Sequence, residues 1–207
     1  GDRYVVSSVA LQGDYLGREA EFKRLVTLEP GEAYNVEDVT NTVKAFTDYF
    51  GAFGYAFAQV DAAPDIDRAT KRVAFTLRAQ PARRVYVRRI NVEGNNRTRD
   101  EVIRREFRQF ESAWYDSDRI RLSRERVDRL GFFTSVELDT QPVPGSPDQV
   151  DLTISVTEKP TGNLTLGAGY SQAEELSIIA GIRQENVFGS GNYLGLDINT
   201  SKFNRQL

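Results

Sequence analysis

The fold is indicated by two similar segments, each of which ends a predicted strand at a glycine: Val9-Ala10-Leu11-Gln12-Gly13 and Ile90-Asn91-Val92-Glu93-Gly94. Similar segments that recur at one fixed separation, here about 80 residues, indicate an internal repeat. The same separation joins residues 31–34 to 111–114, 50–53 to 130–133, and Val73, Phe75, Leu77 and Pro81 to Leu152, Ile154, Val156 and Pro160. The chain is therefore predicted to hold two copies of one domain, a first copy at residues 1–81 and a second copy at 82–160.

Each copy predicts two helices after its first strand. In the first copy Asn35, a good N-cap residue, precedes apolar residues that recur at helical spacing. In the second copy Thr98-Arg99-Asp100-Glu101 predicts a capping box for the shorter helix. Gly51 and Gly131 are expected to end the longer helices in the left-handed conformation. The apolar faces predicted for these helices are Val36, Val39, Val43, Phe46 and Phe50 in the first copy, and Ile103, Phe107 and Phe110 in the second.

The remaining segments of each copy predict strands. Residues 5–11 alternate apolar and polar side chains, and two further strands are expected to meet at turns near residues 64–67 and 142–148. The order β-α-α-β-β predicts an α+β domain, in which two helices cover one face of a three-stranded sheet. The aromatic residues expected in the cores are Phe50, Phe53, Tyr55, Phe132 and Phe133.

The composition excludes several classes of site. The chain has no cysteine and no histidine, so it holds no disulfide, no thiolate metal site and no Ser-His-Asp triad of its own. The commonest general base and the commonest metal ligand are therefore both missing. The net charge of −3 does not favour binding to nucleic acid.

Residues 161–207 differ from both copies. Apolar side chains alternate with small or polar ones in three runs, separated by an expected hairpin loop at 172–174 and a short turn at 188–192. This alternation is typical of a transmembrane β-barrel and equally of a soluble sheet with one buried face. Three such strands cannot close a barrel, so we expect the chain to be an internal segment of a longer protein. The apolar members are Leu164, Leu166, Ala168 and Tyr170, then Leu176, Ile178, Ala180 and Ile182, then Leu194, Leu196 and Ile198.

Several stretches carry a resemblance to a known family. The most specific is Val143-Pro144-Gly145-Ser146-Pro147-Asp148-Gln149-Val150-Asp151, and residues 31–35, 104–111 and 129–133 add to it. These stretches resemble the POTRA repeats of the BamA family of bacterial outer-membrane β-barrel assembly proteins. The resemblance implies that residues 1–81 and 82–160 are the fourth and fifth of five repeats, and that 161–207 are the first strands of an outer-membrane barrel.

The resemblance also implies a function and its partners. Members of this family assemble and insert β-barrel proteins into the bacterial outer membrane, with their repeats in the periplasm. The resemblance therefore implies neither an enzymatic reaction nor a cofactor. Unfolded outer-membrane proteins, outer-membrane lipid and accessory lipoproteins, among them a BamD-like one bound through the second copy, are the implied partners. The alternatives are a related secretion or translocation pore, and a phospholipase-linked relative whose enzyme domain lies outside this chain.

Three sets of site residues follow from this resemblance. Arg104, Arg108 and Glu111 match the lipoprotein-docking positions, although Arg and Glu at helical spacing also describe an ordinary solvated face. An exposed sheet edge can accept an extended substrate as an added strand. The edges expected to do so hold Tyr55, Phe57 and Gln59 in the first copy and Ser135, Glu137 and Asp139 in the second. Leu164, Leu166, Ala168 and Tyr170 form the expected seam strand of the barrel, which Gly162, Gly167 and Gly169 either weaken or relieve of crowding.

Overall fold

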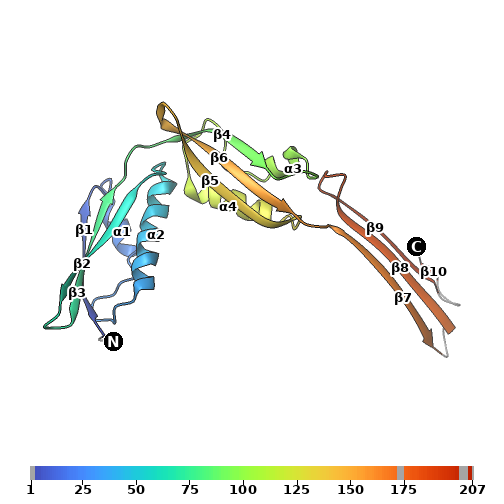
Figure 1. Cartoon of the computed structure of the whole chain (residues 1–207), viewed down its shortest axis with the longest axis horizontal. Coiled ribbons are helices and arrows are strands. Elements are labelled where there is room, and N and C mark those ends of the chain that lie inside the picture. The colour runs from blue at the N-terminus through green and yellow to red at the C-terminus, as the bar shows by residue number, and fades with distance from the viewer. Residues whose placement is uncertain (1–2, 172–174, 201–204, 207) are drawn as a thin grey trace. The chain divides into compact units, whose positions relative to one another are not determined.

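The computed structural model describes residues 3–171, 175–200 and 205–206 (Figure 1). The chain divides into two compact units, and the division passes through the second copy. The first unit comprises Gly1–Ile90, Gln109–Arg121 and Thr140–Leu152, and the second comprises Asn91–Arg108, Leu122–Asp139 and Thr153–Leu207. The hairpin loop expected at residues 172–174 lies outside the described residues.

The first copy has the predicted order of elements. Strand β1 (Val5–Gly13) is followed by helices α1 (Glu19–Arg24) and α2 (Val36–Ala52), then by strands β2 (Gln59–Asp67) and β3 (Arg72–Gln80). The sheet order is β1-β3-β2, with β3 parallel to β1 and antiparallel to β2. Alternate residues of β3 are buried, and the helices lie beside the sheet (Figure 1). The side chain of Asn35 accepts a hydrogen bond from the Glu37 N–H, which confirms the predicted N-cap of α2.

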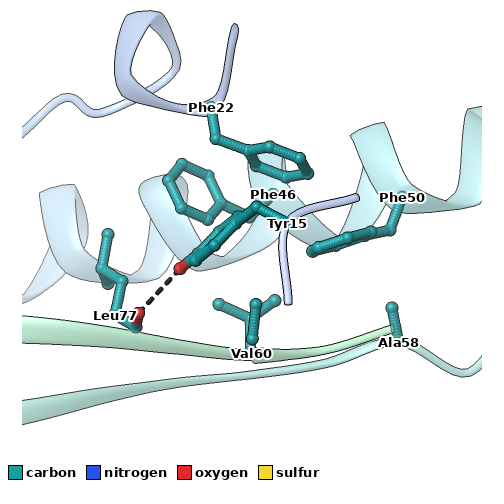
Figure 2. Close-up of a cluster of buried hydrophobic side chains, with 8 residues drawn as sticks. Tyr15, Phe22, Phe46, Phe50, Ala58, Val60 and Leu77 are labelled. Atoms are coloured by element: carbon teal, nitrogen blue, oxygen red, sulfur yellow. Dashed lines mark hydrogen bonds between the residues drawn. The ribbon is translucent and has the colours of Figure 1, made fainter. Parts of the chain in front are cut away.

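An aromatic cluster fills the space between helix α2 and the sheet (Figure 2). Phe22 is the centre of the cluster, with its ring centroid 5.0 Å from that of Phe46 and 4.5 Å from that of Phe50. Tyr15, which is 2% exposed, lies beside them and donates a hydrogen bond of 2.7 Å to the Leu77 carbonyl. Burial of the phenol raises the pKa of Tyr15 to about 12.

The predicted core aromatics are only partly right. Phe50, Phe132 and Phe133 are buried, whereas Phe53 and Tyr55 are half-buried. Sequence reasoning also missed Tyr15 and Phe22, because neither belongs to a long periodic segment. Residue 22 lies in a helix of only six residues, which is too short to show a clear period.

The second copy repeats the same topology. Strand β4 (Tyr86–Glu93), helices α3 (Asp100–Arg104) and α4 (Ser117–Asp128), and strands β5 (Phe133–Val143) and β6 (Ser146–Glu158) follow in order. Their sheet order, β4-β6-β5, corresponds to that of the first copy. The prediction of two α+β copies on three-stranded sheets is thus confirmed. Helix α3 ends at Arg104, so Phe107 and Phe110 lie beyond it, with Phe107 buried and Phe110 exposed.

Two local predictions in the first copy were wrong. Gly51 lies inside α2, and the left-handed residue is Gly54, at φ 97°. Position 51 needs glycine for another reason, because a Cβ there would lie 2.8 Å from the Ser117 Cβ. The turn expected near residues 64–67 comes later, at 68–71, with Pro64 inside β2. Proline is tolerated there because β2 is an edge strand.

Two predictions in the second copy fare better. Gly131 ends its helix with φ 75°, as expected. The turn expected at residues 142–148 is confirmed but tighter, because β5 and β6 leave only Pro144 and Gly145 between them. Gly145, at φ 78°, occupies the position that favours glycine after proline in a type II turn.

The C-terminal segment forms a separate antiparallel sheet. Strands β7 (Gly162–Ser171), β8 (Glu175–Val187) and β9 (Asn192–Thr200) lie side by side, with the short β10 (Arg205–Gln206) beyond β9 (Figure 1). The turn predicted at residues 188–192 is confirmed between β8 and β9. Within the described residues, no helix is long and apolar enough to cross a membrane.

Candidate functional site

The sheet of β7, β8 and β9 carries one continuous apolar face. Leu164 pairs with Ile182, which in turn pairs with Leu196, and the next row consists of Leu166, Ala180 and Ile198. Residues directly opposite each other in antiparallel strands share a face, so the three predicted apolar runs align in register. The face is uncovered in the described chain, with Leu166 74% and Tyr170 77% exposed. An apolar surface of this extent marks an interaction with lipid or protein.

The opposite face of this sheet is polar and rich in glycine. Its rows include Asn163, Arg183 and Gly195, followed by Thr165, Gly181 and Asp197. Arg183 and Asp197 form a salt bridge of 3.3 Å across this face. The two faces therefore differ in chemistry, as the sequence predicted, except that Ile179 of β8 interrupts the polar face.

The glycines of β7 do not share one role. A Cβ at Gly162 would lie 2.5 Å from the Gln184 Oε1, so glycine relieves crowding there. A Cβ at Gly167 would meet nothing closer than the Ile179 Cβ, at 3.8 Å. Contacts among the described residues therefore do not require glycine at position 167. Strand β7 lies at the end of the sheet order, so one of its edges has no partner strand among the described residues.

Glu111 covers part of the outer edge of β4. The N–H of Ser112 donates to the Val87 carbonyl (2.7 Å), and the Val87 N–H donates to the Ala113 carbonyl (2.8 Å). Further along the strand, the Ile90 N–H donates to the Glu111 Oε1 at 2.7 Å. The carboxylate thus takes the place that a strand carbonyl would occupy. Glu111 remains exposed to solvent while serving this local role.

The two arginines of the predicted docking set also have local partners. Arg104 pairs with Asp100 one turn earlier in α3. The Arg108 guanidinium donates to the carbonyls of Arg105 and Phe107, at 3.4 and 3.1 Å. Both arginines belong to the second unit, whereas Glu111 belongs to the first. These contacts fix the local backbone and leave the Arg104 side chain 43% exposed.

The residues nominated for strand addition all lie on an edge strand in the second copy, but only one of them does in the first. Ser135, Glu137 and Asp139 lie on β5, the edge strand of the second sheet. In the first copy β2 begins only at Gln59. Tyr55 and Phe57 precede the strand because the chain is still leaving α2 there. The Tyr55 N–H donates to the Phe50 carbonyl at 3.2 Å, which makes it part of the turn that ends the helix.

Comparison with known proteins identifies the repeated domain. Residues 4–81 and 85–159 match POTRA, described as a surface antigen variable number repeat. The chain belongs to the POTRA family. It is 41% identical over 203 residues to the outer membrane protein assembly factor BamA of Neisseria meningitidis serogroup B, over 98% of this chain and 26% of that protein. It is 32% identical over 201 residues to BamA of Nitratidesulfovibrio vulgaris, over 95% and 25% respectively. The chain thus spans about a quarter of the length of these two relatives.

Solved structures agree with this assignment. The crystal structure of Haemophilus ducreyi BamA lacking POTRA domains 1–3 has a TM-score of 0.79 and 32% identity, over 96% of this chain and 37% of that chain. The Haemophilus influenzae BamA POTRA3–5 structure has a TM-score of 0.72 and 36% identity, over 76% of this chain and 63% of that chain. The resemblance to BamA is therefore confirmed in both sequence and structure.

Sequence reasoning missed a contact between the second POTRA copy and the β8–β9 turn. Thr98 was expected to cap α3, but the N-cap residue is Arg99 and no side chain caps this helix. The Thr98 hydroxyl instead accepts a hydrogen bond of 2.8 Å from the buried Asn186 amide. The Arg99 N–H donates to the Gly189 carbonyl at 2.9 Å. A Cβ at Gly189 would lie 1.8 Å from the Arg97 carbonyl oxygen, so only glycine permits this approach.

A carboxylate orders the same loop from the other side. The Glu158 Oε1 accepts from the N–H groups of Arg97 and Thr98, at 3.1 and 2.6 Å. Burial acts to raise the pKa of Glu158, but the hydrogen bonds from Thr98 and Arg97 outweigh it and hold the pKa below its ordinary value. The glycine pattern at positions 189 and 191 predicted the turn, but nothing in the sequence indicates which loop receives it.

Proposed function

We propose that the chain is the membrane-proximal part of an assembly factor that inserts β-barrel proteins into the bacterial outer membrane. In this proposal the two POTRA copies, the fourth and fifth of a longer series, lie in the periplasm. Residues 161–207 begin the barrel. The observation that carries the proposal is the apolar face of β7, β8 and β9, aligned in register and uncovered. In a barrel that face meets lipid, and the face of glycine, Arg183 and Asp197 meets the lumen.

The comparisons support this placement. The H. influenzae POTRA3–5 structure matches about three quarters of this chain, which is close to the share that the two copies occupy. The H. ducreyi structure, which lacks POTRA domains 1–3, matches 96% of the chain and therefore extends into the strands that follow. The relatives at 41% and 32% identity are named outer membrane protein assembly factors.

The experiment that tests this proposal measures the lipid exposure of each face of β7 separately. Single cysteines at Leu164 and Leu166, and at Thr165 and Gly167 on the opposite face, carry an environment-sensitive fluorophore in the full-length protein in lipid nanodiscs. We expect quenching by spin-labelled lipid at 164 and 166 but not at 165 and 167. A soluble sheet with one face buried by protein would show no lipid quenching at any of the four positions, which would overturn the proposal.

The second POTRA copy is proposed to dock a BamD-like accessory lipoprotein through Arg104, Arg108 and Glu111. Charge-assisted hydrogen bonds from the arginines to partner carboxylates, and from a partner arginine to Glu111, would supply the attraction. Because Glu111 also accepts a backbone hydrogen bond, a charge reversal alone does not separate docking from folding. Glu111→Gln keeps an acceptor oxygen and removes the charge, so it isolates the electrostatic role.

The docking proposal is tested by capture of accessory lipoproteins on the full-length protein. We expect Glu111→Gln to weaken capture and Glu111→Lys to abolish it, with Glu125→Gln on α4 as the matched control. Equal capture by wild type and Glu111→Gln, with loss only in Glu111→Lys, would mean that the residue acts through the β4 edge. In that case the lipoprotein docks elsewhere.

Unfolded outer-membrane proteins are proposed to dock by strand addition at β5. Backbone hydrogen bonds at a sheet edge do not depend on the sequence of the added strand, which suits a factor with many substrates. A photocrosslinker at Glu137 or Asp139, on the edge strand, is expected to capture an unfolded outer-membrane protein. The same group at Thr153, on the central strand β6, is not. Equal crosslinking at both sites would contradict docking at this edge.

A further inference from the structure

The turn between β8 and β9 presents an aromatic side chain to solvent. Phe188 is 90% exposed and has a φ of 51°, a left-handed conformation that is rare for a bulky residue. The turn around it is firmly held. The Asn186 Oδ1 accepts the Gly191 N–H at 2.8 Å while the Asn186 amide donates to Thr98, and the Gly189 carbonyl accepts the Arg99 N–H. The exposure of Phe188 is therefore imposed by the fold.

Two cations lie beside this ring. Arg97, Lys159 and Phe188 line one cavity of about 330 Å³, together with Glu158 and Gln184. Arg97 and Lys159 also line an adjoining cavity of about 580 Å³. Both cations are exposed, and within the described ranges neither the guanidinium nor the ammonium forms a hydrogen bond or salt bridge. The Glu158 carboxylate accepts hydrogen bonds from the backbone N–H groups of Arg97 and Thr98, and it attracts the Arg97 guanidinium without forming a salt bridge to either cation within the described ranges.

These three residues lie where the apolar sheet begins. Strand β7 starts at Gly162, β8 ends at Val187 and β9 starts at Asn192, so Lys159 and Phe188 are within a few residues of three strand ends. If the sheet spans the membrane, its end nearest the POTRA copies lies at the periplasmic boundary of the lipid. Aromatic rings and basic side chains are enriched at such boundaries, where the ring enters the acyl region and the cation meets phosphate.

We propose that Arg97, Lys159 and Phe188 form a phospholipid-binding site at the periplasmic membrane surface, hereafter the junction site. The cations bind the phosphate of an anionic headgroup, and Phe188 inserts between the acyl chains. The partner is lipid because the cations are complementary to phosphate and because the exposed ring lies directly after β8, at the end of the sheet that carries the apolar face. The inference rests on the proposed function, since it requires β7, β8 and β9 to be in the membrane. Its consequence is that the second POTRA copy is held against the bilayer.

The test uses the full-length protein in nanodiscs of phosphatidylethanolamine, with or without phosphatidylglycerol. Native mass spectrometry counts the phosphatidylglycerol that remains bound after release from the nanodisc. We expect Arg97→Gln and Lys159→Gln each to lower retention by about fivefold. Arg124→Gln, an exposed cation of α4, serves as the control and is expected to leave retention unchanged.

A fluorophore at position 188, introduced by Phe188→Cys, reports insertion through quenching by spin-labelled lipid. A second fluorophore at Leu166 reports on the proposed function independently. Quenching at both positions, with loss of phosphatidylglycerol in the charge variants, supports the junction site. Quenching at 166 alone, with unchanged retention, overturns the junction site and leaves the proposed function standing. Absence of quenching at both positions overturns both. Capture of a protein by a crosslinker at 188, in place of lipid quenching, overturns the junction site in favour of a protein interface.

Discussion

The two POTRA copies share a backbone but close the loop after their first strand in different ways. In the first copy, Tyr15 folds inward among Phe22, Phe46 and Phe50 and bonds to the Leu77 carbonyl. The corresponding residue of the second copy is Asn96, which is exposed. The loop of the second copy turns outward instead, so that Thr98 and Arg99 bind the β8–β9 turn. One loop thus completes its own core, and the other holds the strands that follow.

The features that do not differ show what the domain itself requires. Gly13 and Gly94 both have positive φ, and a Cβ would lie 2.2 Å from the Ala79 carbonyl oxygen at the first and 2.0 Å from the Val156 carbonyl oxygen at the second. A hydroxyl also holds the chain after the short helix in each copy. Thr42 accepts the Thr27 N–H at 3.1 Å, and Ser123 accepts the Arg108 N–H at 2.8 Å. The shared backbone is therefore set by glycine and hydroxyl positions, while the loop is free to change its role.

The largest expected effect on stability comes from removing the Tyr15 side chain, which has no aromatic counterpart in the second copy. Tyr15→Ala is expected to destabilise the chain by about 3–5 kcal/mol, because it leaves a cavity in the aromatic cluster. Asn96→Ala is expected to change stability by less than about 0.5 kcal/mol. Urea unfolding followed by circular dichroism measures both. Comparable losses in the two variants would show that the loops are equivalent after all.

Alanine at the shared glycines is expected to act equally in the two copies. Gly13→Ala and Gly94→Ala should each cost roughly 2–4 kcal/mol, from the left-handed backbone and the overlap with a carbonyl oxygen. Gly31→Ala is the control, because Gly31 has φ 97° but a Cβ there would meet no atom within 4 Å, and it should cost about 1 kcal/mol. Unfolding midpoints for the three variants provide the measurement. An unchanged unfolding midpoint in Gly94→Ala would show that the two copies do not depend on this glycine in the same way.

Weakening the outward-turned loop is expected to loosen only the β8–β9 turn. Asn186→Ala should cost about 1–3 kcal/mol locally, because it removes the partner of the Thr98 hydroxyl and of the Gly191 N–H. Glu158→Gln should cost about 1 kcal/mol, because it keeps one acceptor oxygen and loses only the charge of the hydrogen-bonded carboxylate. Faster hydrogen exchange at residues 186–191, with the first copy unchanged, is the expected result, and Asn192→Ala is the control.

The same contact is expected to depend on acid. The pKa of Glu158 is lowered in the folded chain, so its contribution is present above the ordinary glutamate pKa of 4.5 and is lost as the pH falls through the lower folded value. Wild-type exchange at 186–191 should therefore accelerate below pH 4.5 once the intrinsic pH dependence of exchange is removed, and Glu158→Gln should not show this change. An identical acid response in the variant would assign it to another group.

The smallest effect is expected from the hydroxyl of Tyr15. Tyr15→Phe keeps the ring and loses one buried hydrogen bond, for a cost of about 1 kcal/mol at neutral pH. Because the folded pKa is raised from 10.0 to about 12, wild type loses stability as the pH rises from 10 toward 12, when only the unfolded tyrosine ionises. The variant should lose less over this range, as thermal unfolding at several pH values would show. A steeper loss in Tyr15→Phe would contradict the assigned cause.

Much of this architecture could be predicted because it follows from the spacing of residue types along short stretches of the chain. The offset of about 80 residues indicated two copies, the helical period of residues 36–50 indicated α2, and Pro144-Gly145 indicated a tight turn. The period of two in β7, β8 and β9 indicated a two-faced sheet. The local predictions that were wrong concern residues whose role is set by a contact with another part of the chain. Gly51 serves the approach of Ser117, and Thr98 bonds to Asn186 in place of capping its own helix.

The sequence by itself determined the repeat, the order of elements and which side chains of each strand share a face, because these follow from spacing along one chain. Only the tertiary structure decided the register that aligns three apolar runs into one face, the coverage of the β4 edge by Glu111, and the meeting of Arg97, Lys159 and Phe188. Each of these joins residues far apart in sequence. Such contacts depend on pairing energies between segments, which no single segment encodes.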